Sequence, residues 1–66
     1  MQKTLGFIGL GIMGFPMAGH LATKGYKVSV FNRTIRKSQD WIKKYNGTLC
    51  ESLSELAESS EVIFLC

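Results

Sequence analysis

The feature that most constrains the fold is the segment from Gly9 to Gly14, which reads Gly-Leu-Gly-Ile-Met-Gly and has the spacing G-x-G-x-x-G. It follows the largely apolar residues 5–8, which are typical of a strand buried on both faces. Residues with helical spacing come directly after it. A G-x-G-x-x-G turn that joins a strand to a helix is typical of a βαβ unit that binds a dinucleotide. The first expectation is therefore an α/β fold.

The rest of the chain alternates strands with helices. We expect strands at residues 5–8, 27–32, 48–50 and 61–66, and helices at residues 13–24, 36–45 and 53–57. Gly25 should end the first helix, because glycine readily adopts the left-handed conformation found there. Thr34 is the expected N-cap of the second helix, and Ser52 with Glu55 forms a capping box for the third. The sheet-facing side chains are expected to be Trp41, Ile42 and Tyr45 in the second helix and Leu53, Leu56 and Ala57 in the third.

This element order, β-α-β-α-β-α-β, predicts a Rossmann-type doubly wound parallel sheet with right-handed crossovers. The fourth strand should lie beside the first, opposite the second and third. The first two helices should cover one face of the sheet and the third helix the other. A complete domain of this type has two mononucleotide halves, more than 66 residues hold. We therefore expect residues 1–66 to form the N-terminal part of an NAD(P)-binding domain.

Each glycine of the turn has an expected task. Gly9 makes the tight turn, Gly11 lets the backbone approach the pyrophosphate, and Gly14 lets the helix pack against the strand. The N–H groups of Ile12 and Met13, at the positive end of the helix, should donate to phosphate oxygens. We expect the cofactor to lie against the whole turn, which consists of Gly9, Leu10, Gly11, Ile12, Met13 and Gly14.

The tip of the second strand indicates which dinucleotide binds. NAD sites usually place an acidic residue about 20 residues after the glycine turn, whereas NADP sites offer arginine. Here the strand ends at Asn32, Arg33 and Thr34, with Arg36 and Lys37 just beyond, and no carboxylate occurs between the turn and residue 40. A guanidinium, a hydroxyl and a helix N-terminus suit a 2′-phosphate. The sequence therefore favours NADP over NAD.

Composition and charge exclude several other functions. The formal net charge is +3, but the basic residues are scattered, so we expect no nucleic-acid partner. The apolar stretch 5–18 is broken by glycines and is shorter than the roughly 20 residues of a membrane span. Cys50 and Cys66 lack metal-like spacing, so we expect two free thiols, no bound metal and a reducing, cytoplasmic location. His20 follows the phosphate turn on its helix and is expected to pack or face solvent, without a catalytic role.

Residues 7–20 closely resemble the N-terminal signature of the β-hydroxyacid dehydrogenases, a family that includes 3-hydroxyisobutyrate dehydrogenase and the glyoxylate/succinic semialdehyde reductases. Residues 28–34 resemble the strand tip of its NADP-preferring members. The resemblance implies that Asn32, Arg33, Thr34 and Lys37 hold the 2′-phosphate of NADP. It also implies hydride transfer between the nicotinamide and a small β-hydroxy acid or semialdehyde. The family's catalytic lysine lies beyond Cys66, so no catalytic residue is assigned in this chain.

The same resemblance implies an all-helical second domain beyond the chain end, through which the protein would assemble as a homo-oligomer. Two alternatives stay open. One is a non-catalytic dinucleotide-binding module of the same fold, which would lack the catalytic lysine. The other is a 6-phosphogluconate dehydrogenase-type enzyme, although those enzymes typically have alanine at the position of Gly11.

Overall fold

The computed structural model describes residues 3–65, so the expected thiol of Cys66 lies outside the described residues. The seven elements occur in the order that the sequence predicts. They are β1 (Thr4–Ile8), α1 (Gly14–Thr23), β2 (Lys27–Phe31), α2 (Ile35–Lys44), β3 (Thr48–Leu49), α3 (Leu53–Ser59) and β4 (Val62–Leu65).

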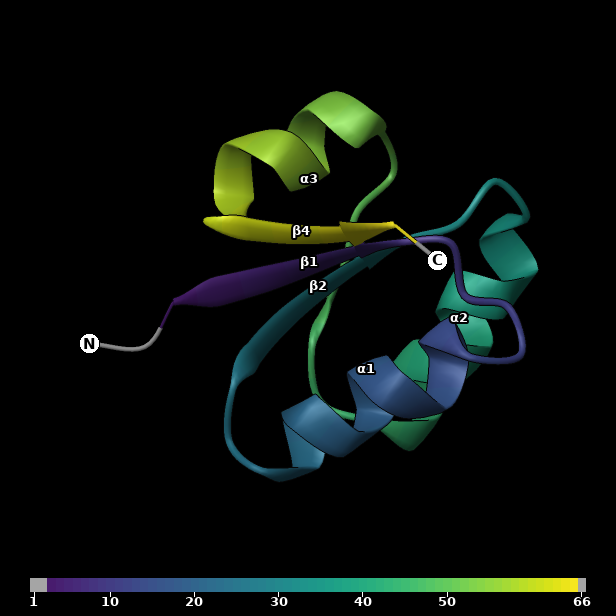
Figure 1. Cartoon of the computed structure of the whole chain (residues 1–66). Coiled ribbons are helices and arrows are strands. Elements are labelled where there is room, and N and C mark those ends of the chain that lie inside the picture. Colours follow the sequence, from purple (N-terminus) through teal and green to yellow (C-terminus); the bar gives the residue numbers. More distant parts are fainter. Residues whose placement is uncertain (1–2, 66) are drawn as a thin grey trace.

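The four strands form one parallel sheet in the order β3-β2-β1-β4, as expected. In Figure 1, α1 and α2 lie on one side of the sheet and α3 on the other. The register places Phe7 of β1 beside Val30 of β2 and Phe64 of β4. This confirms the Rossmann-type α/β fold, with the carboxyl ends of β1 and β2 adjacent at the edge where the glycine turn begins.

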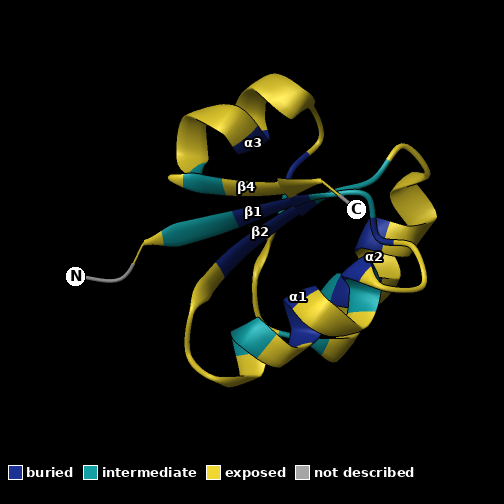
Figure 2. Ribbon diagram, in the orientation of Figure 1, coloured by how far each residue is buried: buried dark blue, intermediate teal, exposed yellow. Residues whose placement is uncertain are grey.

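The core lies between the sheet and the α1–α2 layer. Its largest member is Trp41, which is 0% exposed and donates its Nε1–H to the carbonyl oxygen of Phe15 over 3.2 Å. Tyr45 contacts the rings of Trp41 and Phe15. Figure 2 shows the buried residues in the central strands and on the inner side of these two helices. The buried cluster consists of Phe7, Leu10, Ala18, Val28, Val30 and Trp41. The expected inward face of α2 is therefore confirmed for Trp41, with Ile42 and Tyr45 packed partly buried against the cluster.

The opposite face of the sheet is covered by α3, in which Leu56 is the buried residue. Leu56 is 0% exposed and lies over Gly6, where an added Cβ would be 2.8 Å from its Cδ2 atom. The expectation that Leu53 and Ala57 also face the sheet is wrong, because both are exposed. A helix of seven residues has about two turns, and Leu56 is the residue of α3 that is buried.

The helix caps follow the predicted positions, with two differences in detail. Thr34 is the N-cap of α2, but its side chain makes no capping hydrogen bond. The Ser52 hydroxyl does cap α3, accepting from the Glu55 backbone N–H over 3.1 Å. The Glu55 carboxylate accepts from the N–H of Glu51 over 2.8 Å, one residue earlier than the capping box predicts.

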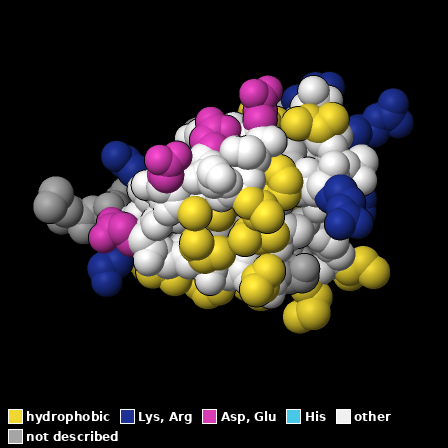
Figure 3. Space-filling model, turned by 90° about the horizontal axis from the view of Figure 1, so that it is seen from above, with side chains coloured by type: hydrophobic (Ala, Val, Ile, Leu, Met, Phe, Trp, Pro, Cys, Tyr) yellow, Lys and Arg dark blue, Asp and Glu magenta, His cyan; other side chains and the backbone are white. Residues whose placement is uncertain are grey.

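Strand β4 is more exposed than a central parallel strand, which is normally covered on both faces. Phe64 stacks on Phe7 with 4.9 Å between ring centroids. Even so, Ile63, Phe64 and Leu65 are 43%, 37% and 82% exposed. Figure 3, a view onto the α3 side, shows hydrophobic side chains gathered next to a row of acidic ones. Within residues 3–65, β4 pairs with β1 alone, so its other edge is open.

Candidate dinucleotide site

The glycine turn begins at the carboxyl end of β1 and has the conformation that its glycine spacing predicts. Gly9 has a φ of 95°, a left-handed conformation that glycine adopts without strain. Its N–H donates to the carbonyl oxygen of Phe31 over 2.9 Å, which ties the turn to the end of β2. A Cβ placed on Gly11 would meet no atom within 4 Å. The backbone at Gly11 therefore faces open space, which a ligand could occupy.

Helix α1 begins three residues after this open position, with Gly14 buried at its first residue. Ile12 and Met13 precede the helix and are 95% and 71% exposed. Among the turn and loop hydrogen bonds of the described residues, none is donated by the backbone N–H of Ile12 or Met13 to a backbone oxygen. Unpaired amides at the N-terminus of a helix, together with the helix dipole, favour an anion. The turn thus has the donors and the space that a pyrophosphate needs.

Leu10 and Asn32, which the sequence assigns to the cofactor site, are joined to each other in the structure. The Leu10 side chain is 1% exposed and belongs to the core. Its backbone N–H donates to Asn32 Oδ1 over 2.8 Å, while Asn32 Nδ2 donates to the Thr34 carbonyl oxygen over 3.0 Å. Both polar ends of the Asn32 amide are therefore engaged with the protein. Only one feature of the sequence could have indicated this, a short amide side chain directly after a strand.

The basic residues expected at the strand tip are brought together around the start of α2. Arg33 and Thr34 occupy the turn between β2 and α2, and Arg36 and Lys37 lie in the first turn of the helix. All four are exposed. The Thr34 hydroxyl makes no capping bond, and the Thr34 carbonyl accepts from the Lys37 N–H over 3.1 Å. The tip presents two guanidinium groups, an ammonium group and a hydroxyl to solvent, a set suited to a phosphate.

An open recess of about 420 Å³ adjoins the glycine turn. It is lined by Gly11, Ile12, Met13, Gly14, Met17 and Leu65. Sequence reasoning assigned the first four of these to the cofactor and missed Met17 and Leu65. Leu65 comes from β4, so its approach to the turn depends on the pairing of β4 with β1 and is invisible in the local sequence. The side chains of Met13, Met17 and Leu65 give the recess an apolar wall beside the turn, which suits a flat ring at the end of a dinucleotide.

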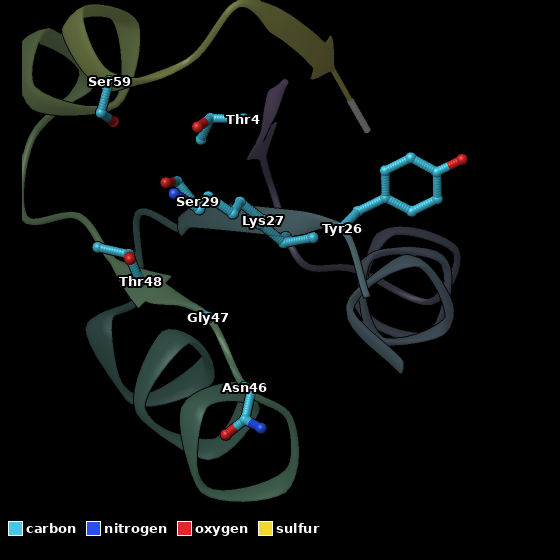
Figure 4. Close-up of a pocket in the computed structure, with 9 residues that line it drawn as sticks. Thr4, Tyr26, Lys27, Ser29, Asn46, Gly47, Thr48 and Ser59 are labelled. Atoms are coloured by element: carbon cyan, nitrogen blue, oxygen red, sulfur yellow. The ribbon is translucent and has the colours of Figure 1, made fainter. Parts of the chain in front are cut away.

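A second recess, of about 470 Å³, lies at the other end of the strands (Figure 4). Thr4, Lys27 and Thr48, at the amino ends of β1, β2 and β3, contribute to its wall, as do Ser29 and Ser59. None of the residues assigned to the cofactor lines it. Ligands of open α/β sheets bind at the carboxyl ends of the strands, so the candidate site is the glycine turn and not this recess.

Four further observations concern the described residues. Residues 3–65 contain no group of three or more histidine, cysteine or acidic side chains placed to hold a metal ion. None of their helices is long and apolar enough to span a membrane. Cys50 is a buried free thiol, and its burial raises its pKa above the ordinary value of 9.0. His20 is exposed in α1, six residues after Gly14.

Comparison with known proteins bears on this site. The model of one protein family, described as the NAD binding domain of 6-phosphogluconate dehydrogenase, matches residues 4–66. A protein of Arabidopsis thaliana named probable 3-hydroxyisobutyrate dehydrogenase-like 1, mitochondrial, is 47% identical over 60 residues, which are 91% of this chain and 18% of that protein. The chain spans about one fifth of the length of the curated relatives it matches.

Solved structures give the same fold. A Mycobacterium tuberculosis 3-hydroxyisobutyrate dehydrogenase with L-serine aligns with a TM-score of 0.86 at 27% identity, covering 98% of this chain and 22% of that one. An imine reductase from Myxococcus stipitatus in complex with NADP+ aligns with a TM-score of 0.86 at 31% identity, covering 94% and 21%. These matches confirm the fold and the resemblance that the glycine turn and strand tip indicate.

Proposed function

We propose that this chain, which belongs to the protein family described as the NAD binding domain of 6-phosphogluconate dehydrogenase, binds NADP between its glycine turn and the tip of β2. The observation that carries this proposal is the open space at Gly11, beside the exposed residues Ile12 and Met13 that precede α1. A pyrophosphate there would receive hydrogen bonds from the amides and favourable interaction with the helix dipole. The preference for NADP is a finer proposal, argued next.

The preference for NADP rests on charge at the strand tip. Position 32 carries a neutral amide, and its two polar ends are engaged within the protein. Arg33, Thr34 and Lys37 are exposed around the N-terminus of α2, where they would bind the 2′-phosphate. The imine reductase described above, whose structure was solved in complex with NADP+, supports the same preference.

We further propose that the protein is an oxidoreductase for a small β-hydroxy acid or semialdehyde. The name of the Arabidopsis relative and that of the mycobacterial enzyme support this substrate class. A bound nicotinamide dinucleotide supplies the hydride chemistry. The residues of this chain would bind the phosphates and orient the cofactor, and the apolar wall formed by Met13, Met17 and Leu65 would lie beside the nicotinamide half.

The experiment is a pair of fluorescence titrations of the intact protein with NADPH and NADH, followed by turnover assays with a panel of β-hydroxy acids and semialdehydes. Tighter binding of NADPH, with oxidation or reduction of at least one panel member, is expected. Absence of binding to either cofactor would remove the proposal. Binding without turnover would favour a non-catalytic dinucleotide-binding module.

Cytoplasmic location and homo-oligomeric assembly also belong to this proposal. The buried free thiol of Cys50 supports a reducing compartment. Cell fractionation with an antibody and light scattering of the purified intact protein test the two statements separately. Recovery in an organelle fraction would contradict the first, and a monomer would contradict the second.

A further inference from the structure

We propose that Asn32 is a positioning residue that joins the pyrophosphate half of the site to the 2′-phosphate half; this inference rests on the proposed NADP-binding function. Asn32 Oδ1 accepts the Leu10 N–H over 2.8 Å, and Asn32 Nδ2 donates to the Thr34 carbonyl oxygen over 3.0 Å. Leu10 belongs to the glycine turn, and Thr34 belongs to the tip that carries the basic residues. One side chain therefore bridges two segments that would hold different phosphates of one ligand.

The orientation of this amide is set by its partners. Exchanging its oxygen and nitrogen would place an N–H group against the Leu10 N–H and an oxygen against the Thr34 carbonyl oxygen. Both contacts would then be repulsive. The observed orientation is the one that satisfies both partners, so Asn32 is held from two sides.

A backbone hydrogen bond beside the Leu10–Asn32 bond also holds the glycine turn to the end of β2. The Gly9 N–H donates to the Phe31 carbonyl oxygen over 2.9 Å, directly before the Leu10–Asn32 bond. Regular pairing of β1 with β2 ends at Ile8 and Phe31, so the Asn32 side chain continues the ladder where backbone pairing stops. The Leu10 side chain is buried in the core. Its peptide is therefore fixed from both sides, directly before Gly11, the residue that must lie close to the pyrophosphate.

Neither an aspartate nor a leucine at position 32 would serve both partners. An aspartate could accept from the Leu10 N–H, but its carboxylate could not donate to the Thr34 carbonyl oxygen. A leucine of similar size would serve neither. Asn32 would therefore favour NADP in two ways, by leaving out a negative charge and by holding the Thr34 backbone in place.

The test measures dissociation constants of NADPH and NADH for the intact protein and for Asn32→Leu. If Asn32 positions the glycine turn, Asn32→Leu should raise the dissociation constants of both NADPH and NADH by about tenfold. This is the effect expected when a buried donor loses its hydrogen bond. Direct contact of Asn32 with the 2′-phosphate would weaken NADPH alone. Asn46→Leu is the matched control, because Asn46 is exposed and lies at the other end of the strands from the proposed site. This variant should change neither dissociation constant.

A second measurement detects the hydrogen bond between Asn32 and the Leu10 N–H in the absence of cofactor. Amide hydrogen exchange at Leu10 should quicken by about tenfold or more in Asn32→Leu, because the N–H loses its acceptor, and stay unchanged in Asn46→Leu. If Asn32→Leu does not fold, Asn32→Ser takes its place, since one short hydroxyl cannot reach both partners.

Selective loss of NADPH in Asn32→Leu, or no loss at all, would overturn the positioning role. Failure of the wild-type protein to bind either cofactor is a different result. It would remove the proposed function, and with it this role of Asn32, even where hydrogen exchange still detects the bond to Leu10.

Discussion

Leu10 and Asn32 are 22 positions apart in the chain, and the backbone N–H of Leu10 donates to Asn32 Oδ1 over 2.8 Å. The bond lies where the regular pairing of β1 with β2 ends, two residues after Ile8 and one residue after Phe31. It holds the glycine turn against the β2 tip. The separation between the two proposed phosphate subsites is therefore fixed by the protein before any ligand binds, which lowers the conformational cost of binding.

Replacement of Arg33 by alanine should weaken NADPH selectively. Arg33 is exposed at the strand tip, where its guanidinium would bind the 2′-phosphate that NADH lacks. We expect Arg33→Ala to lose about 1.5–3 kcal/mol of NADPH binding free energy, the range for a charged hydrogen bond, with NADH nearly unchanged. Calorimetric titration measures both. Lys43→Ala removes the same charge from the last turn of α2, at the other end of that helix, and serves as the control. Equal losses for the two cofactors in Arg33→Ala would contradict the assignment.

A side chain at Gly11 should block both dinucleotides and leave the fold intact. A Cβ at this position meets no protein atom within 4 Å, so Gly11→Val introduces its bulk into the space that the pyrophosphate would take. We expect neither NADPH nor NADH to bind at millimolar concentration, with an unfolding temperature close to that of the wild type. A folded Gly11→Val protein with normal NADPH affinity would refute the phosphate turn.

Trp41 should be the most sensitive position of the core. It is 0% exposed, packs against Tyr45 and donates to the Phe15 carbonyl oxygen. Trp41→Ala should lower the free energy of unfolding by about 3–5 kcal/mol, the usual range for loss of a buried aromatic side chain. Trp41→Phe keeps an aromatic ring, loses the hydrogen bond and should lose less. Urea denaturation measures both variants, and equal effects would show that the ring contributes little.

Stability should fall in alkaline solution because of Cys50. Burial raises the pKa of its thiol above 9.0, an effect that the negative charge of Glu55 reinforces and hydrogen bonds with Ser59 and Ser29 reduce. The folded protein therefore holds this proton at pH values where the unfolded chain releases it. The contribution of the protonated Cys50 thiol to the free energy of unfolding is complete below pH 9.0. It declines as the pH rises from 9.0 towards the raised pKa of the thiol.

The difference between the wild type and Cys50→Ala isolates this effect from the titration of lysines and tyrosines. The wild type should lose more unfolding free energy than Cys50→Ala between pH 8 and pH 10. Parallel pH profiles for the two proteins would show that the thiol keeps its ordinary pKa.

A polypeptide limited to residues 1–66 should associate in solution. Ile63, Phe64 and Leu65 are exposed on β4, whose outer edge is unpaired within residues 3–65. An apolar strand with an open edge is a template for pairing with other chains. Light scattering should detect oligomers or aggregates, and Leu65→Lys should reduce them by placing a charge on the strand. A cooperatively unfolding monomer would contradict this prediction.

The sequence by itself determined the type and order of the elements, because each depends on local chemistry. The spacing of Gly9, Gly11 and Gly14 marks the turn, Gly25 marks the end of α1 with a φ of 100°, and Ser52 caps α3 through its own near neighbours. The shape of the turn that we propose for the cofactor was predictable for the same reason, since a strand, a glycine turn and a helix N-terminus are contiguous in the chain.

Tertiary structure alone decided which of these groups remain available to a ligand. The Leu10 amide and the Asn32 side chain lie in separate segments, and only the pairing of β1 with β2 brings them together. Leu65 reaches the glycine turn because β4 pairs with β1 on the side away from β2. Leu53 has an apolar side chain yet faces solvent, because α3 meets the sheet at Leu56. Hydrogen bonds and burial between distant segments depend on how the strands pair and how the helices pack. The local pattern of residues does not determine that pairing or that packing.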